Sequence, residues 1–170
     1  RVHGTLQALL ESQHGVDVVG EHHLAGRMAD WPLIVVPEWD YLEPAFRDEL
    51  AAYAKGGGSL LLVGPRTAAL FAAEVGATPQ GEPTRDPRHL AHGGALVPVK
   101  GESQTVTPGP DAKPFGRLHA ASDPASASTP AATVAPLGKG RLAAARFSHC
   151  RPPDPVPARP RRLGEGPRVP

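Results

Sequence analysis

The residues best suited to chemistry stand in a short polar stretch directly after an apolar run. Glu38 and Asp40 flank Trp39 at the end of the run 31–37. Paired carboxylates can serve as general acid and base, and a tryptophan ring can stack on a sugar. Ligands of open parallel sheets bind beyond the carboxyl ends of the strands, where this stretch would lie. Arg66 occupies the comparable turn after the next apolar run, so we take Glu38, Trp39, Asp40 and Arg66 as candidate ligand-binding residues.

A simpler interpretation gives these side chains structural roles. Asp40 or Glu43 would cap the first turn of the following helix, where a negative charge also suits the helix dipole. Arg66 would then be a surface or interface residue. We favour this interpretation for the two acids, because glycoside hydrolysis needs carboxylates about 5 to 9 Å apart across the substrate, and nothing in the sequence fixes such a spacing.

The sequence does not indicate a catalytic nucleophile. A hydrolase or amidotransferase on such a sheet carries Cys or Ser on a tight strand-to-helix turn, and neither comparable turn has one. Thr67 on the second turn is interpreted as a helix cap, and the single cysteine, Cys150, stands at the edge of a proline-rich stretch. None of the eight histidines comes with the further ligands of a metal set. We therefore predict no catalytic residue, no metal and no cofactor.

The elements that would hold these residues alternate between helix and strand. Apolar residues at helical spacing predict three helices, at 3–13, 43–55 and 67–75. Continuous apolar runs predict three strands, at 16–19, 31–37 and 59–63, of which the last two would be covered on both faces. This order predicts an α/β fold with a doubly wound, mostly parallel sheet. Its core would consist of Leu33, Ile34, Val35, Val36, Leu60, Leu61, Leu62, Val63, Phe46, Leu50 and Phe71.

The second half of the chain is less regular. Residues 79–130 form a loop-rich stretch, in which 96–99 and 104–107 are candidate edge strands. Residues 131–147 read as a β-hairpin around a glycine turn, so we predict one domain over 1–148. The remaining residues, 149–170, are rich in Pro and Arg and cannot build a core, which predicts a disordered tail.

Two segments together resemble a known family. Trp31-Pro-Leu-Ile-Val-Val-Pro-Glu-Trp-Asp-Tyr-Leu42, followed by a helix and by Tyr53-Ala-Lys-Gly-Gly-Gly-Ser-Leu-Leu-Leu-Val-Gly64, is similar to the class I glutamine-amidotransferase-like domain of glycoside hydrolases, as in the β-galactosidase trimerisation domain. The late segment Pro136-Leu-Gly-Lys-Gly-Arg-Leu-Ala-Ala-Ala-Arg-Phe147 is similar to a strand near that domain's end. The resemblance covers 1–78 and 131–147 and leaves the middle uncovered.

The resemblance implies a flavodoxin-like fold that has lost the amidotransferase cysteine, which agrees with the absent nucleophile. It also implies attachment to a catalytic barrel of the same parent protein, and a role in oligomerisation or in walling the active site. The family's usual first strand is missing before residue 3, so the resemblance implies a piece of a longer protein. A sheet that lacks a central strand would expose its backbone edge.

Composition limits the classes of partner. The chain has 170 residues and a formal net charge of +1, which gives no reason to expect nucleic acid or a membrane as partner. Nothing indicates a compartment. The leading hypothesis is a non-catalytic accessory or oligomerisation domain of a glycoside hydrolase, forming a homo-oligomer. The alternatives are a small hydrolase acting through Glu38 and Asp40, and a module that binds a sugar beside Trp39 without chemistry.

Overall fold

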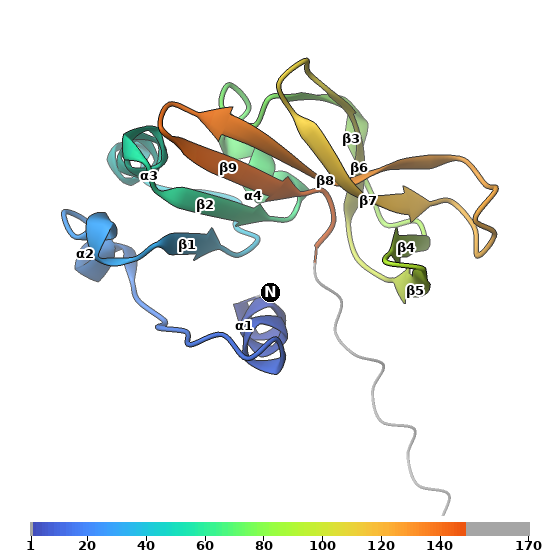
Figure 1. Cartoon of the computed structure of the whole chain (residues 1–170), viewed down its shortest axis with the longest axis horizontal. Coiled ribbons are helices and arrows are strands. Elements are labelled where there is room, and N and C mark those ends of the chain that lie inside the picture. Colours follow the sequence, from blue (N-terminus) through green and yellow to red (C-terminus); the bar gives the residue numbers. More distant parts are fainter. Residues whose placement is uncertain (1, 149–170) are drawn as a thin grey trace, which may run out of the picture.

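The computed structural model describes residues 2–148 as an α/β fold, shown in Figure 1. Its helices are α1 (Val2–Glu11), α2 (Glu21–Leu24), the 3-10 helix η1 (Met28–Asp30), α3 (Pro44–Gly56) and α4 (Pro65–Leu70). Its strands are β1 (Leu33–Val36), β2 (Ser59–Val63), β3 (Ala77–Thr84), β4 (Arg88–His92), β5 (Ala95–Val99), β6 (Ser103–Pro108), β7 (Lys113–His119), β8 (Ser128–Leu137) and β9 (Gly140–Ala145).

The main sheet is curled and mixed. Seven strands follow the order β1-β2-β9-β8-β7-β4-β5, and β3 pairs with β6 in a separate two-stranded sheet. Strands β1, β2 and β9 are parallel, whereas the remaining pairs are antiparallel. The α/β fold is confirmed, but the prediction of a mostly parallel sheet is wrong. The reason is that short turns join β4 to β5 and β8 to β9, and a short turn can only return the chain antiparallel.

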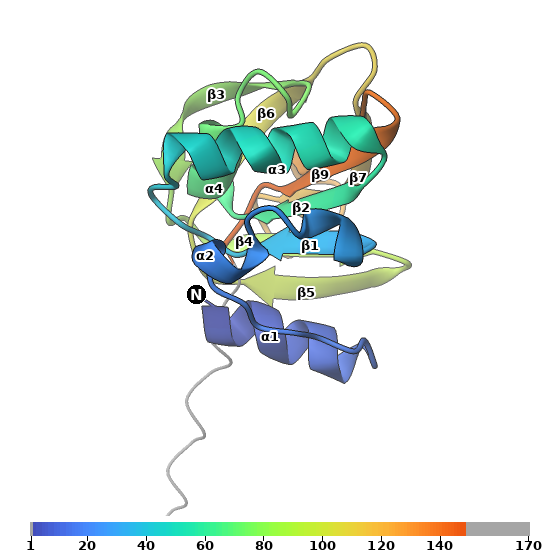
Figure 2. The same ribbon diagram turned by 90° about the vertical axis from the view of Figure 1, so that its left-hand side faces the viewer.

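Helix α3 forms the crossover that makes β1 and β2 parallel. Pro44 stands in its first turn, where a missing N–H leaves no bond unmade. The helix ends at Gly56, and the next residue, Gly57, has φ of 126° and donates its N–H to the carbonyl of Ala54. The buried residues Phe46 and Leu50 face the sheet. The helix packs against β2 and β9, over which it lies in Figure 2.

The core lies on one face of the parallel strands. Alternate residues of these strands pack with α3 and α4 and are buried: Ile34, Val36, Leu60, Leu62, Leu142 and Ala144. The residues between them face the other way and are only partly covered. Leu33 is 45% exposed, and Leu61 is half-buried. The prediction that these strands are covered on both faces is therefore wrong for the described residues.

Several elements differ from the sequence-based expectation. The apolar run 16–19, expected to be a strand, pairs with no described strand, and its Val18 is exposed. Helix α4 is shorter than the predicted 67–75. Strands β5 and β6 confirm the two candidate edge strands, and β3, β4 and β7 add three strands to the stretch expected to be loop-rich. The hairpin of β8 and β9 is confirmed.

Helix α1 stands apart from these layers. Figures 1 and 2 both show it outside the stack formed by the main sheet and α3.

The predicted tail, 149–170, lies outside the described residues. Within the described part, no helix has the length and apolar character needed to cross a bilayer.

Candidate functional site

The predicted site residues come together at the carboxyl ends of β1 and β2. Glu38, Trp39 and Asp40 follow β1, and Arg66 lies in the first turn of α4, which follows β2. Because β1 and β2 are parallel neighbours, their carboxyl ends meet at one edge of the sheet. This is the edge at which open parallel sheets bind ligands.

Thr67 ties the two segments to each other. Its hydroxyl accepts a hydrogen bond of 2.7 Å from the Trp39 N–H and donates to the carbonyl of Pro37 at 3.0 Å. The side chain is fully buried. The interpretation of Thr67 as a helix cap is wrong, because Gly64 is the residue before the helix and no side chain caps it. Thr67 instead fixes the backbone of the loop after β1.

Replacing Thr67 by Val should lower the free energy of unfolding by about 1–3 kcal/mol, because the Trp39 N–H would lose its acceptor. Valine keeps the shape of the side chain and removes only the hydroxyl. Urea denaturation followed by circular dichroism measures the change. Thr67→Ser keeps the hydroxyl and should retain most of the stability. Equal losses in both variants would show that the hydroxyl has no such role.

The two acids lie in different environments. Glu38 is 3% exposed and packs against Gly64, whose φ is 96°. A Cβ atom at position 64 would lie 2.6 Å from the Cδ of Glu38, so a glycine is required there. Asp40 points into solvent, and its carboxylate lies 3.4 Å from the Nη1 atom of Arg66. Asp40 is therefore an exposed partner of Arg66, whereas Glu38 is buried.

An ion-pair network surrounds Arg66. Its Nε atom donates to Oε2 of Glu102 at 2.6 Å, and its Nη2 atom donates to Oε1 at 3.0 Å. Arg85 also binds Oε1 of Glu102, at 3.0 Å. Sequence reasoning missed Glu102 and Arg85. Glu102 stands 36 residues after Arg66, beyond the reach of any local pattern, and only the folding of distant segments brings the two together.

The network predicts a pH dependence of stability. The hydrogen bonds from Arg66 lower the pKa of Glu102 from its usual 4.5 to about 2, against the opposing effect of burial, and Arg85 adds to the lowering. The unfolded carboxyl group binds a proton more readily than the folded one. The stabilisation by Glu102 is therefore complete above pH 4.5 and is lost as the pH falls toward 2. Urea denaturation across this range should show a shallower decline for Glu102→Gln than for the wild type. Identical slopes would contradict the role of Glu102.

The helix-capping interpretation of the acids does not describe their contacts. Glu43 precedes α3, but its side chain makes no capping hydrogen bond. Asp40 pairs with Arg66 across the loop. The loop thus presents Asp40 and Trp39 outward, and Trp39 is 48% exposed.

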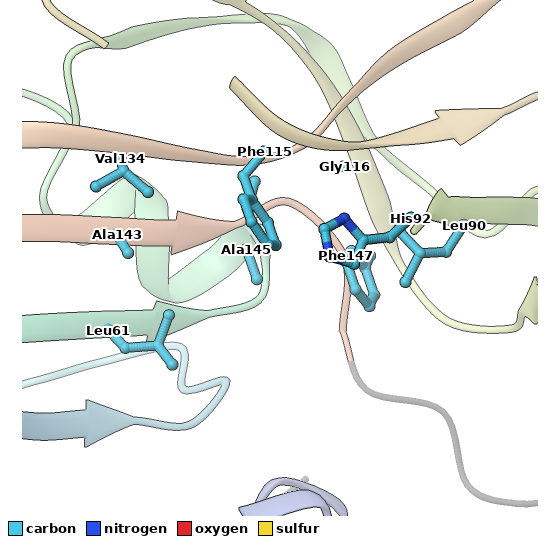
Figure 3. A pocket seen from close by; sticks show the side chains of 10 residues that line it. Leu61, Leu90, His92, Phe115, Gly116, Val134, Ala143, Ala145 and Phe147 are labelled. Carbon is cyan, nitrogen blue, oxygen red and sulfur yellow. The ribbon is translucent and has the colours of Figure 1, made fainter. Parts of the chain in front are cut away.

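The other face of the sheet holds an apolar hollow of about 420 Å³, shown in Figure 3. Its wall is formed by side chains of β2, β4, β7, β8 and β9, including Leu61, Val134, Ala143, Phe115 and Leu90. Among the described residues that line it, His92 is the one titratable side chain, and its ring packs on Phe115 with 4.5 Å between the centroids. Residues 2–148 contain no group of three or more side chains that could hold a metal ion.

Comparison with known proteins identifies solved structures with a similar fold. No protein-family model and no curated protein matches the sequence. The structure is similar to the GH42 β-galactosidase Gan42B from G. stearothermophilus. The TM-score is 0.68 and the sequence identity is 18%. The match covers 85% of this chain and 22% of that one.

Two further structures extend this comparison. The exo-β-1,4-mannosidase Op5Man5 from Opitutaceae bacterium strain TAV5 has a TM-score of 0.66 and 15% identity, over 86% of this chain and 26% of its own. A cytoplasmic protein of Salmonella typhimurium LT2 has a TM-score of 0.63 and 13% identity, over 88% of this chain and 76% of its own.

The chain thus spans about a fifth of the length of the β-galactosidase chain that it matches. At these identities the likeness shows a shared fold alone. The same fold occurs as part of glycoside hydrolase chains and as most of a smaller protein.

Proposed function

We propose that this chain is a non-catalytic accessory domain of a glycoside hydrolase and that it self-associates. The observation that carries the proposal is the fold, which matches about a fifth of a β-galactosidase chain and about a quarter of a mannosidase chain. In this proposal the catalytic barrel of the same parent protein performs the hydrolysis, and the chain serves assembly.

We further propose that the chain is a glutamine-amidotransferase-like domain of the β-galactosidase trimerisation type. The order β1-α3-β2-α4 is what a flavodoxin-like, glutamine-amidotransferase-like domain would contain. The turn at Gly138 and Lys139, between β8 and β9, agrees with the resemblance of that segment to the β-galactosidase trimerisation domain. The residues at the two strand-to-helix turns supply neither Cys nor Ser, which favours an assembly role over amidotransfer.

The exposed edge of β1 supports self-association. Strand β1 ends the seven-stranded order, so it has one strand neighbour among the described residues. Leu33 on this strand is 45% exposed, and the strand contains no proline. The opposite edge strand, β5, carries Pro98, which removes one backbone donor and blunts that edge. Strand β1 is therefore the edge better suited to pairing with another chain.

The alternative of a small hydrolase is less well supported. It would need Glu38 and Asp40 in one pocket, with the pKa of one carboxyl raised. Glu38 lies buried against Gly64, whereas Asp40 lies in solvent beside Arg66. Binding of a sugar beside Trp39 does not need these acids to cooperate.

Turnover by the full chain tests the non-catalytic role. Nitrophenyl β-galactoside and nitrophenyl β-mannoside should show no hydrolysis above the rate of a buffer blank. An authentic β-galactosidase in the same assay serves as the positive control. Hydrolysis that disappears in Asp40→Asn or Glu38→Gln would overturn the proposal and establish the hydrolase.

A further inference from the structure

We propose that Trp39 and Tyr41 form an aromatic platform that binds a pyranose ring, with Asp40 and Arg66 hydrogen-bonding its hydroxyl groups. This inference concerns ligand binding and does not depend on self-association. It adds Tyr41, which the sequence analysis did not name as a site residue. It also gives the exposed ion pair of Asp40 and Arg66 a role in binding.

Both aromatic side chains of the aromatic platform are open to solvent. Trp39 is 48% exposed and Tyr41 is 66% exposed, although the residues on either side, Glu38 and Leu42, are buried. The loop is thus anchored at both ends and presents its middle outward. Single exposed apolar residues need no explanation, but two large exposed rings that stand two residues apart on one anchored loop are the basis of the proposed site.

The backbone at Trp39 and the side chain of Arg66 are held in place before any ligand arrives. Thr67 fixes the backbone at Trp39 with its hydrogen bond of 2.7 Å. Glu102 holds the Nε and Nη2 atoms of Arg66, which aims Nη1 at Asp40. Little conformational entropy is lost on binding when the contacting groups are already positioned.

The chemistry around the rings favours a carbohydrate over a protein. Arginine and aromatic residues are common in protein interfaces, but carboxylates are depleted there, and here the carboxylate of Asp40 stands between the rings in the chain and pairs with Arg66. A pyranose has an apolar face of C–H groups, which the negative face of an aromatic ring attracts. It also has hydroxyl groups, to which a carboxylate and a guanidinium can bond. The aromatic platform lies at the carboxyl ends of β1 and β2, where ligands of such sheets bind.

Saturation-transfer NMR on the full chain tests this inference, with galactose and lactose as probes and mannitol as an acyclic control. Signal transfer to the ring protons should be half-saturated at roughly 1 mM, the affinity of a small open site. Trp39→Ala and Tyr41→Ala should each weaken binding by roughly tenfold, a loss expected of one aromatic contact. Phe115→Ala is the matched control, because Phe115 is an exposed aromatic residue of β7 and lines the hollow instead. It should bind as the wild type does.

Three results would overturn the inference. The first is no transfer from either sugar at ~50 mM, far above a millimolar dissociation constant. The second is equal weakening by Phe115→Ala. The third is unchanged sugar binding together with a lower particle mass in Trp39→Ala, which would make the aromatic platform a protein interface. Circular dichroism spectra and melting curves check that each variant is folded. Particle mass reports self-association separately from sugar binding, so failure of one proposal is distinguishable from failure of the other.

Discussion

Leu62→Ala should lower the free energy of unfolding by about 2–5 kcal/mol, the largest loss that we expect from a single truncation in this chain. Leu62 on β2 is fully buried in the core that the strands form with α3 and α4. Removing its branched end leaves a cavity that the surrounding side chains fill only in part. Urea denaturation followed by circular dichroism measures the loss.

Leu61→Ala is the matched control, because the same atoms are removed from the adjacent residue of the same strand. Leu61 is half-buried and lines the apolar hollow on the other face. Its truncation should cost about 1 kcal/mol or less, since it gives up less buried surface and creates no closed cavity. Equal losses at the two positions would contradict the assignment of the core to one face of the sheet.

Gly140→Ala should also be strongly destabilising, by roughly 3 kcal/mol or more, because the new Cβ atom would overlap main-chain atoms. It would meet the carbonyl oxygens of Gly58 and Ala54, and neither can move without disturbing the end of α3. Thermal unfolding of the purified variant should show a lower midpoint, or the variant should fail to accumulate as folded protein.

Gly56→Ala is the control for this substitution. Gly56 ends α3, and a Cβ atom there would meet nothing within 4 Å. Alanine in a helix is favoured over glycine by about 1 kcal/mol, so stability should be unchanged or slightly higher. A harmless Gly140→Ala would mean that α3 and β9 do not approach as closely as the structure has them.

The local parts of the fold could be predicted from the sequence. Helix α3 carries its own start and stop signals in Pro44 and in the glycines that follow it, and β2 and the β8–β9 hairpin are apolar runs beside glycine turns. These signals act within a few residues, so no knowledge of the rest of the chain is needed. The loop that carries Trp39 is identified in the same way, because it directly follows a buried strand.

The remaining parts depend on residues far apart in the chain. Whether an apolar run such as 16–19 becomes a strand depends on a partner, which the run itself does not specify. Strands β3, β4 and β7 are rich in polar residues, and antiparallel pairing with distant segments holds them in place. Glu102 likewise contacts Arg66 only because the fold brings two distant segments of the chain together.

The particle mass of the full chain tests the central claim of an assembly domain most directly. Sedimentation equilibrium should give a multiple of the chain mass of 17.7 kDa. Leu33→Lys places a charge on the open edge of β1 and should shift the mass toward the monomer. Val97→Lys, which changes a residue 51% exposed on the opposite edge strand, should leave the mass unchanged. A wild-type mass of 17.7 kDa at every concentration, from about 1 μM to the limit of solubility, would contradict the claim.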